Sequence, residues 1–164
     1  ILALSLSREV PKLQRDGVRI HFVGARDNLS SRVKKGLEEA EAATANNTVL
    51  TLNVCFNYGG RWDIASAAAK LAADGILITE KSLSGALSLA HCGDPDLLIR
   101  TGNEKRLSNF LLWQAAYSEL YFSTSLWPDF DEGALDSALL EFWSRERRFG
   151  KTSDQITSNL THDA

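Results

Sequence analysis

The stretch TVLTLNVCF, residues 48–56, decides the fold class. It is β-branched and mostly apolar, which is typical of a strand covered on both faces in a parallel sheet. The stretch before it, SSRVKKGLEEAEAATANN (30–47), carries apolar residues at helical spacing, and WDIASAAAKLAADG (62–75) after it is also helical in composition. Another β-rich run, VRIHFVG (18–24), comes earlier. The alternation predicts an α/β fold, a parallel sheet with flanking helices.

The same pattern continues toward both ends of the chain. We expect an opening helix that stops at Gly17 and a helix that starts after Thr79 and ends near Cys92. A strand at 96–101 and a buried apolar helix at 108–120 should follow. The final helix should be capped by Asp131 and run to Gly150. The tail, 151–164, is polar and expected to fray. Without a linker or an internal repeat, residues 1–150 are predicted to form part of a single domain.

Composition narrows the classes of function. The formal net charge of −3 argues against a broad basic surface for nucleic acid, so any phosphate chemistry must be local. No apolar run approaches the roughly 18 residues of a membrane span. Cys55 and Cys92 lack metal-ligand spacing, and we interpret them as buried thiols in a reducing cytoplasm. The chain has no Met and opens like the middle of a helix, so we interpret it as part of a longer protein.

The loop after the strand at 96–101 is the first candidate site, because ligands of open parallel sheets bind beyond the carboxyl ends of the strands. Its two guanidinium groups, Arg100 and Arg106, can each hold phosphate oxygens bidentately. Gly102 frees the backbone for a close approach or a positive φ. The following helix would add a hydroxyl from Ser108 and free N–H groups. The alternative is that the arginines are solvated charges that pair with Glu104, and that Ser108 only caps the helix.

A second loop, NYGGRWD (57–63), follows the strand at 48–56. Its glycines permit a tight turn, and Arg61 is available to a ligand at the same edge of the sheet. The alternative is a structural turn in which Asp63 caps a helix and Trp62 packs in the core. From this loop alone, the structural alternative is favoured.

Long motifs connect these two loops to a known family. DLLIRTGNEKRLSNFLLWQAAYSELYF (96–122), with WPDF (127–130) and RERRFG (145–150) after it, resembles the C-terminal signature of cis-prenyltransferases of the undecaprenyl diphosphate synthase type. LTLN (50–53) and NYGGRWD resemble that family's middle signature. The resemblance implies a Rossmann-like α/β fold and an enzyme that uses Mg²⁺. Such enzymes add isopentenyl diphosphate units in cis to an allylic diphosphate such as farnesyl diphosphate, and make long-chain polyprenyl diphosphates for cell-wall synthesis.

The resemblance also assigns site residues. It implies that Arg100, Arg106 and Ser108 bind the diphosphate of isopentenyl diphosphate, with Leu107 contributing its backbone. It further implies that Glu119 helps to place Mg²⁺. We assign no catalytic residue, because the family's Asp belongs to a DGNGRW-like segment that this chain does not contain. We therefore expect the 164-residue chain alone to be inactive.

Two positions depart from the family pattern. Lys105 stands where some relatives carry a metal-site His, and it cannot ligate Mg²⁺ while protonated. Asn103 replaces a common Gly, although Asn tolerates positive φ better than most residues. Leu50, Leu52 and Phe110 could line an apolar tunnel, but core packing is the favoured role.

The resemblance further implies a homodimer that uses residues 109–130, with Arg147 and Arg148 reaching a neighbouring site. The aromatic types in this region suit an interface core, although they could instead close the monomer's own core. We expect a cytoplasmic protein, with peripheral contact at the inner face of the membrane through its lipid product. The alternative functions are a non-catalytic partner subunit and a nucleotide-binding domain, and the second lacks GxGxxG and GxxxxGK[ST] motifs.

Overall fold

The computed structural model describes the backbone of residues 2–145 and the side chains from residue 8 onward. The chain divides into two compact units, Ile1–Cys92 and Gly93–Ala164. Arg147, Arg148 and the tail at 151–164 lie outside the described residues. The prediction that the final helix runs to Gly150 is wrong, because this helix ends at Ser144 and Arg145 is extended.

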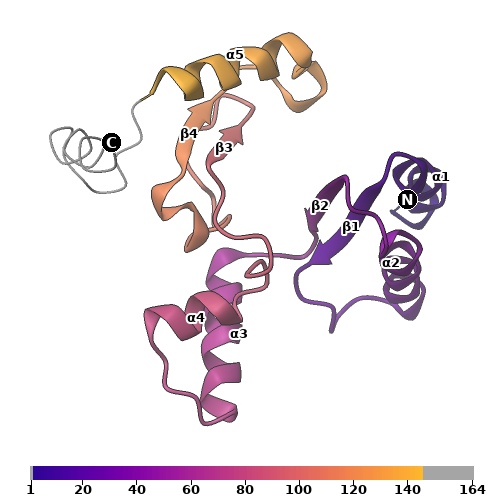
Figure 1. The fold of residues 1–164 in the computed structure, drawn as a ribbon, viewed down its shortest axis with the longest axis vertical. Coiled ribbons are helices and arrows are strands. Elements are labelled where there is room, and N and C mark those ends of the chain that lie inside the picture. Colours follow the sequence, from indigo (N-terminus) through magenta and orange to yellow (C-terminus); the bar gives the residue numbers. More distant parts are fainter. Residues whose placement is uncertain (1, 146–164) are drawn as a thin grey trace, which may run out of the picture. The chain divides into compact units, whose positions relative to one another are not determined.

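The first unit confirms the predicted alternation of helices and strands (Figure 1). Its elements are α1 (Leu2–Arg15), β1 (Val18–Val23), α2 (Ser31–Thr44), β2 (Leu50–Cys55), α3 (Gly60–Ala73) and α4 (Glu80–Ala86). Thr79 starts α4 as predicted, through a reciprocal capping box with Ser82. The helix ends well before Cys92, because Leu87 is extended and the N–H of Ser88 donates to the buried carboxylate of Asp63 at 2.9 Å.

β1 and β2 run parallel, and α1 and α2 cover one face of the pair (Figure 1). Alternate side chains of β1 point to this face, where Ile20 and Phe22 are buried. They form a core with Leu37 and Ala40 of α2. Packed against this core are Val10, Leu13, Leu29, Val33, Val54 and Phe56. The core confirms the apolar periodicity read from the sequence.

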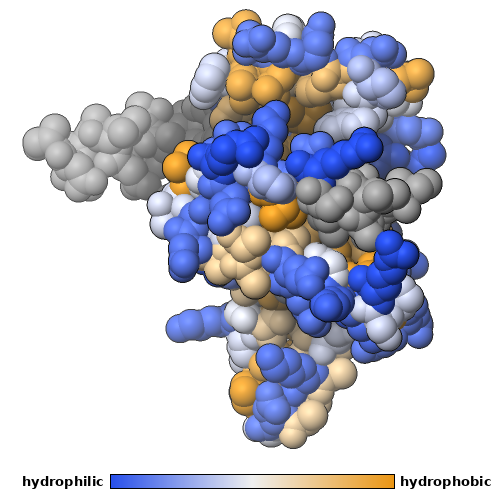
Figure 2. All heavy atoms as spheres, turned by 90° about the vertical axis from the view of Figure 1, so that its right-hand side faces the viewer, coloured by the Kyte–Doolittle hydropathy of each residue, from blue (hydrophilic) through white to orange (hydrophobic). Residues whose placement is uncertain are grey.

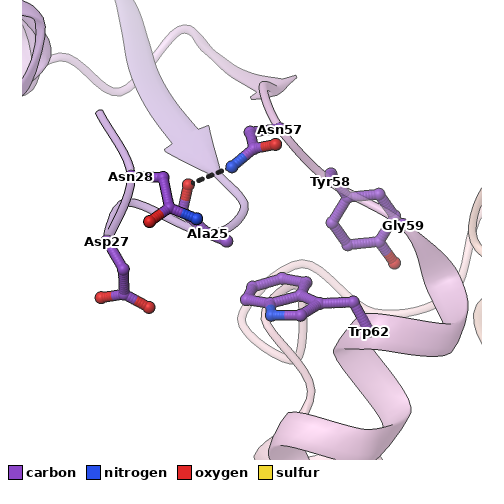
Figure 3. Close-up of a pocket in the computed structure, with 7 residues that line it drawn as sticks. All are labelled: Ala25, Asp27, Asn28, Asn57, Tyr58, Gly59 and Trp62. Atoms are coloured by element: carbon purple, nitrogen blue, oxygen red, sulfur yellow. Dashed lines mark hydrogen bonds between the residues drawn. The ribbon is translucent and has the colours of Figure 1, made fainter. Parts of the chain in front are cut away.

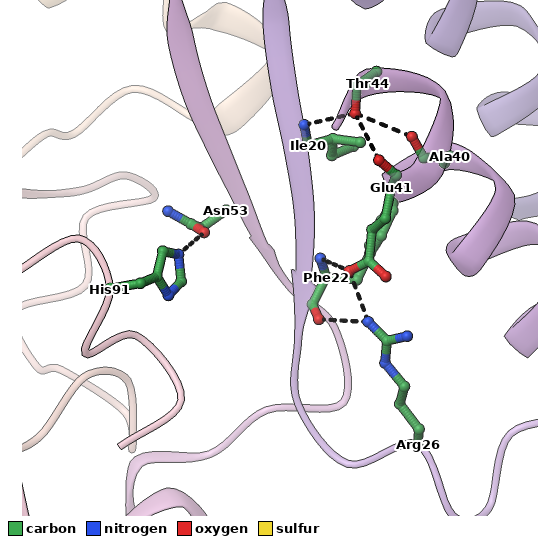
Figure 4. A network of polar contacts seen from close by, with 8 residues as sticks. All are labelled: Ile20, Phe22, Arg26, Ala40, Glu41, Thr44, Asn53 and His91. Carbon is green, nitrogen blue, oxygen red and sulfur yellow. Dashed lines mark hydrogen bonds and ion pairs between the residues drawn. The ribbon is translucent and has the colours of Figure 1, made fainter. Parts of the chain in front are cut away.

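Polar side chains of α2 close the outer edge of β1 (Figure 4). The hydroxyl of Thr44 accepts the N–H of Ile20 at 3.1 Å and donates to the carbonyl of Ala40 at 3.0 Å. The carboxylate of Glu41 accepts the N–H of Phe22 at 2.8 Å. An uncovered strand edge presents unpaired donors that invite aggregation. Here α2 supplies both the apolar cover and the hydrogen-bond acceptors.

β2 is the less protected strand of this pair. Leu50 and Leu52 are exposed, as is Val49 before them, so the favoured core role of the two leucines is not observed within residues 8–145. On the face drawn in Figure 2, apolar groups in orange lie at the surface between hydrophilic groups in blue. Among the described residues, β1 is the only strand that pairs with β2.

The second unit contains a second parallel pair, β3 (Leu97–Arg100) and β4 (Glu119–Phe122). Two short 3₁₀ helices, η1 (Gln114–Tyr117) and η2 (Trp127–Asp129), flank β4. The last element is α5 (Glu132–Ser144), which packs on β4. Asp131 caps α5 as predicted, with its carboxylate accepting the N–H of Ala134 at 2.9 Å.

The buried helix predicted at 108–120 is wrong. Ser108, Asn109 and Leu111 have positive φ values of 50°, 65° and 47°, which a right-handed helix cannot contain. Only η1 is helical, and residues 119–122 pair as β4 instead. Phe110 is exposed, which contradicts its favoured core role. A run that is apolar on most sides is compatible with a helix or a buried strand, and pairing with β3 decides between them.

Replacing Thr44 with Val should lower the free energy of unfolding by about 1–3 kcal/mol, because the buried N–H of Ile20 loses its acceptor while the side-chain volume is nearly kept. Equilibrium urea unfolding measures the change. Thr48→Val is the matched control, since Thr48 is exposed, and its effect should stay within about 0.5 kcal/mol. Equal effects of the two substitutions would contradict the proposed closure of the β1 edge.

Candidate functional site

The loop that follows β3 is held against the chain that follows β4. The N–H of Ser123 donates to the carbonyl of Arg100 at 2.8 Å, and the N–H groups of Gly102 and Asn103 donate to the carbonyls of Ser125 and Ser123 at 2.7 and 2.9 Å. Gly102 and Asn103 have φ values of 82° and 57°. Positive φ was one of the two alternatives expected for Gly102, and Asn at 103 tolerates the same conformation. The loop therefore has a defined backbone path.

The two arginines of this loop differ in their surroundings. Arg100, the last residue of β3, is half-buried, and its guanidinium makes no ion pair or hydrogen bond with another described residue. Arg106 pairs with Glu104 at 2.5 Å, as the structural alternative expected, but its side chain is 68% exposed. Exposed ion pairs contribute about 0–1 kcal/mol. The pair with Glu104 therefore holds Arg106 only weakly.

Ser108 and Leu107 sit in a turn. The carbonyl of Leu107 accepts the N–H of Phe110 at 3.1 Å. Ser108 is exposed and caps no helix, because no helix begins at this point. The predicted contribution of a helix N-terminus to anion binding is therefore wrong. What the turn offers a ligand is the hydroxyl of Ser108 and backbone groups of an exposed loop.

Glu119 is the first residue of β4, and its Oε2 accepts a hydrogen bond from Nη1 of Arg145 at 2.9 Å. Its Oε1 has no hydrogen-bond partner among the described residues. Mg²⁺ uses one or two carboxylates together with water and substrate phosphates. Across the described part of the chain, no three His, Cys, Asp or Glu side chains form a metal-holding group. Glu119 thus fits a single carboxylate ligand but does not form a metal centre with its neighbours.

The structure does not bring Glu119 and Arg100 together. In the β3–β4 register, Leu97 lies opposite Glu119 and Arg100 lies opposite Phe122. Glu119 is therefore at the other end of the pair, roughly 10 Å from Arg100 along the strands at about 3.3 Å per residue. Because side chains alternate between faces, the two also project from opposite faces. The register therefore does not place the two side chains side by side.

A pocket of about 460 Å³ lies at the carboxyl ends of β1 and β2 (Figure 3). The two loops that form it are tied by Asn57, whose side chain donates to the carbonyl of Ala25 at 2.8 Å. Between them Gly24 has φ 140°, and a Cβ there would lie 2.1 Å from the carbonyl oxygen of Phe56. The pocket is lined by Ala25, Asp27, Asn28, Asn57, Tyr58, Gly59 and Trp62. Sequence reasoning identified the second loop but missed residues 25–28, although they also follow a predicted strand.

The structural alternative for NYGGRWD is wrong in two details. Trp62 is 37% exposed and forms a wall of the pocket, edge-on to Tyr58, instead of packing in the core. Asp63 does not cap α3, because Gly59 holds the N-cap position. The buried carboxylate of Asp63 instead accepts hydrogen bonds from the Tyr58 hydroxyl at 2.9 Å and the Ser88 hydroxyl at 2.6 Å. Asp63 therefore fastens the pocket loop to the chain beyond α4.

A histidine pair lies on the face of β1 and β2 away from α1 and α2. The rings of His21 and His91 are 5.1 Å apart, and Nε2 of His91 is 3.0 Å from Oδ1 of Asn53 (Figure 4). Burial lowers the pKa of His21, and the nearby charges of Arg19 and His91 lower it further, against an opposing effect of Glu41.

The cysteines near this pair are both free. Cys55 is partly buried, and burial raises the pKa of its thiol, with added effects of Asp63 and Cys92. Cys92 is exposed, so the prediction that both thiols are buried is wrong. Cys92 is the last residue of the first unit and lies in a loop, where its sulfur accepts a hydrogen bond from the Asn53 side chain of β2 at 3.7 Å.

Comparison with known proteins identifies the family of the chain. The family model described as "Putative undecaprenyl diphosphate synthase" matches residues 1–150. The chain belongs to this family. It is 54% identical to the isoprenyl transferase of Neisseria gonorrhoeae over 153 residues, which is 93% of this chain and 62% of that protein. It is 48% identical to a ditrans,polycis-undecaprenyl-diphosphate synthase of Pseudomonas aeruginosa described as (2E,6E)-farnesyl-diphosphate specific, over 95% of this chain and 65% of that protein.

Two solved structures are similar in fold to this chain. A "probable undecaprenyl diphosphate synthase" from Campylobacter jejuni matches with a TM-score of 0.85 at 35% identity, over 92% of this chain and 71% of that one. Lavandulyl diphosphate synthase from Lavandula x intermedia, in complex with dimethylallyl diphosphate, matches with a TM-score of 0.83 at 35% identity, over 91% and 68%. The undecaprenyl diphosphate synthase fold predicted from the motifs is confirmed. The chain spans about three fifths of the length of the first curated relative.

The His21 environment predicts a pH dependence of stability. The pKa of His21 is lowered in the folded protein from its ordinary value of 6.5, so the unfolded chain takes up the proton more readily. The free energy of unfolding should therefore fall as the pH is lowered through and below 6.5. Urea unfolding at pH 7.5 and 5.5 measures this loss.

His21→Gln should reduce the loss of unfolding free energy at low pH, because a glutamine side chain does not titrate. Arg32→Gln removes an exposed cation from α2 and should leave the loss unchanged. A His21→Gln variant with the full wild-type pH dependence would rule out His21 as its source.

Proposed function

We propose that the full-length protein is a cis-prenyltransferase that condenses isopentenyl diphosphate with an allylic diphosphate. The proposed allylic substrate is farnesyl diphosphate. The product would be a long-chain polyprenyl diphosphate, the precursor of a lipid carrier for cell-wall synthesis. The observation that carries the proposal is the fixed loop after β3, with an unengaged Arg100 and a weakly paired Arg106. The names of the related proteins support the same reaction class.

In this proposal the loop binds the diphosphate of isopentenyl diphosphate. Arg100 and Arg106 present paired N–H groups to its oxygens, Ser108 donates its hydroxyl, and Leu107 contributes its backbone. The allylic C–O bond breaks, diphosphate leaves, the isopentenyl double bond supplies the new C–C bond, and a proton is lost. The loop's share of catalysis is positioning and charge stabilisation.

Mg²⁺ is the proposed cofactor, and it would neutralise diphosphate charge when bound. Glu119 is the proposed carboxylate ligand, through its open Oε1. Because Glu119 and Arg100 lie on opposite faces of the β3–β4 pair, the metal site and the diphosphate loop are separate proposals that need separate measurements.

The function is tested by chain elongation with radiolabelled isopentenyl diphosphate and farnesyl diphosphate in the full-length protein. Arg106→Ala and Arg100→Ala should each weaken isopentenyl diphosphate binding by about 1.5–3 kcal/mol, the scale of a hydrogen bond to a charged group. Calorimetric titration measures that loss. Arg32→Ala removes an exposed arginine of α2 and is the matched control.

The 164-residue chain alone should give no product, because it contains no DGNGRW-like motif to supply the family's Asp. Unchanged affinity in both loop variants would remove the loop from the mechanism. A full-length protein that binds isopentenyl diphosphate but elongates nothing alone would favour the non-catalytic partner subunit.

We also propose that the full-length protein is a homodimer that uses residues 109–130. Within that range Trp127 is 77% exposed and Tyr117 is 65% exposed, and both are residue types enriched in interface cores. Tyr121 is partly buried in β4, so a charge there would disturb the sheet as well as an interface.

Trp127→Asp should therefore convert the dimer to a monomer in light scattering at micromolar concentration. Trp143→Asp is the matched control, because Trp143 is 69% exposed on α5 and lies outside the proposed interface. A wild-type monomer would refute the dimer. Dissociation by Trp143→Asp alone would move the interface to α5.

None of the helices within residues 2–145 has both the length and the apolar character that a bilayer crossing requires. We propose a cytoplasmic location for the full-length protein, with peripheral contact at the inner face of the membrane when its lipid product is released.

A further inference from the structure

Arg145 joins the end of α5 to the start of β4. It occupies the C-cap position of α5, and its Nη1 donates to Oε2 of Glu119 at 2.9 Å and to the carbonyl of Leu120 at 3.0 Å. Its Nη2 donates to the carboxylate of Glu141, one turn earlier in α5. Both terminal nitrogens of the guanidinium are therefore engaged, and contacts from two elements fix its position.

These contacts also fix the carboxylate of Glu119. Oε2 is held by Arg145, while Oε1 has no hydrogen-bond partner among the described residues. The Glu119 side chain is about one quarter exposed, so an ion can reach it. The guanidinium of Arg145 stays charged, because arginine is not deprotonated in proteins. One oxygen is thus anchored, and the other is presented in a defined direction.

The charges of Glu119, Arg145 and Glu141 together favour a cation at Oε1 of Glu119. Arg145 alone would neutralise Glu119 and weaken its attraction for a metal ion. Glu141 supplies a second carboxylate, so the three side chains Glu119, Arg145 and Glu141 carry a sum of −1. With Glu141 balancing Arg145, the anchored Glu119 keeps its attraction for a divalent cation.

We propose that Arg145 is a positioning residue for the Glu119 carboxylate, and that Glu141 maintains this role by balancing the charge of Arg145. The inference rests on the proposed function of Glu119 as a ligand of a divalent cation. Groups that orient a metal ligand typically change metal affinity by about 10–100-fold when they are removed. Arg145 would act in this way without touching the ion.

The test is a titration of the full-length protein with Mn²⁺ in the presence of isopentenyl diphosphate, followed by the electron paramagnetic resonance signal of the free ion. Arg145→Gln should weaken Mn²⁺ binding by about tenfold, and Arg145→Lys should restore part of the loss because it keeps the charge and one donor. Glu141→Gln should weaken binding less, since its amide oxygen can still accept from Arg145 while the balancing charge is gone.

Two comparisons separate positioning from a general loss of structure. Asp136→Asn removes an exposed carboxylate from the same helix and should leave Mn²⁺ binding unchanged. Calorimetric affinity for isopentenyl diphosphate without metal should also stay unchanged in Arg145→Gln, because Arg100 lies on the other face of the strand pair.

The outcomes distinguish this inference from the proposed function. If Glu119→Gln binds Mn²⁺ as the wild type does, Glu119 is not a ligand, and its proposed role fails together with the inference. If binding requires Glu119 but Arg145→Gln matches the wild type, only the positioning role is overturned. If circular dichroism shows that Arg145→Gln is unfolded, the other two variants decide. Wild-type affinity for Mn²⁺ in both Arg145→Lys and Glu141→Gln would then overturn the positioning role of Arg145.

Discussion

The hydrogen bonds from β1 to α2 are the constraint on which the first unit depends. A parallel pair of two strands leaves an outer edge of unpaired N–H groups, and burying such groups without acceptors is costly. Thr44 and Glu41 provide those acceptors, while Leu37 and Ala40 of the same helix supply the apolar contact. Because one helix does both, the carboxyl ends of β1 and β2 are held in register, and the loops that form the pocket start from fixed positions.

The second unit is held by hydrogen bonds between its loops and by ion pairs. Its loop after β3 is tied by backbone hydrogen bonds to the chain after β4, and the Arg100 guanidinium makes no ion pair with another described residue. Its two arginine pairs differ in strength for a physical reason. Arg106 and Glu104 form one exposed contact, whereas Arg145 makes several hydrogen bonds and is partly shielded from solvent. The first pair is suited to exchange with phosphate, and the second to permanent support.

Both candidate sites lie where open parallel sheets place ligands, beyond the carboxyl ends of strands. The pocket combines Asn and Asp side chains with an aromatic wall from Trp62, and the Arg100 loop is cationic. Their chemistry differs accordingly: the loop suits a diphosphate, and the pocket offers polar and aromatic surface. Within the second unit, Glu119 lies at the amino end of β4, at the other end of the strand pair from Arg100, and Arg145 donates a hydrogen bond to its carboxylate.

The sequence by itself determined the alternation of helices and strands, the caps at Thr79 and Asp131, the family and the Arg100 loop. The alternation and the caps depend on short-range spacing and local turn chemistry, which a single sequence displays. The family followed from the resemblance of its long motifs. Positive φ at Gly102 was one of two conformational roles that the sequence left open, and the structure has it.

Only the tertiary structure decided the secondary structure of residues 108–120, the exposure of Trp62, and the hydrogen-bond partners of Asp63 and Glu119. Strand pairing with β3 turned the end of an apolar run into β4. Asp63 meets Ser88 across 25 residues, and Glu119 meets Arg145 across 26. Such contacts have no periodic signature, because they arise when the folded backbone brings distant side chains together.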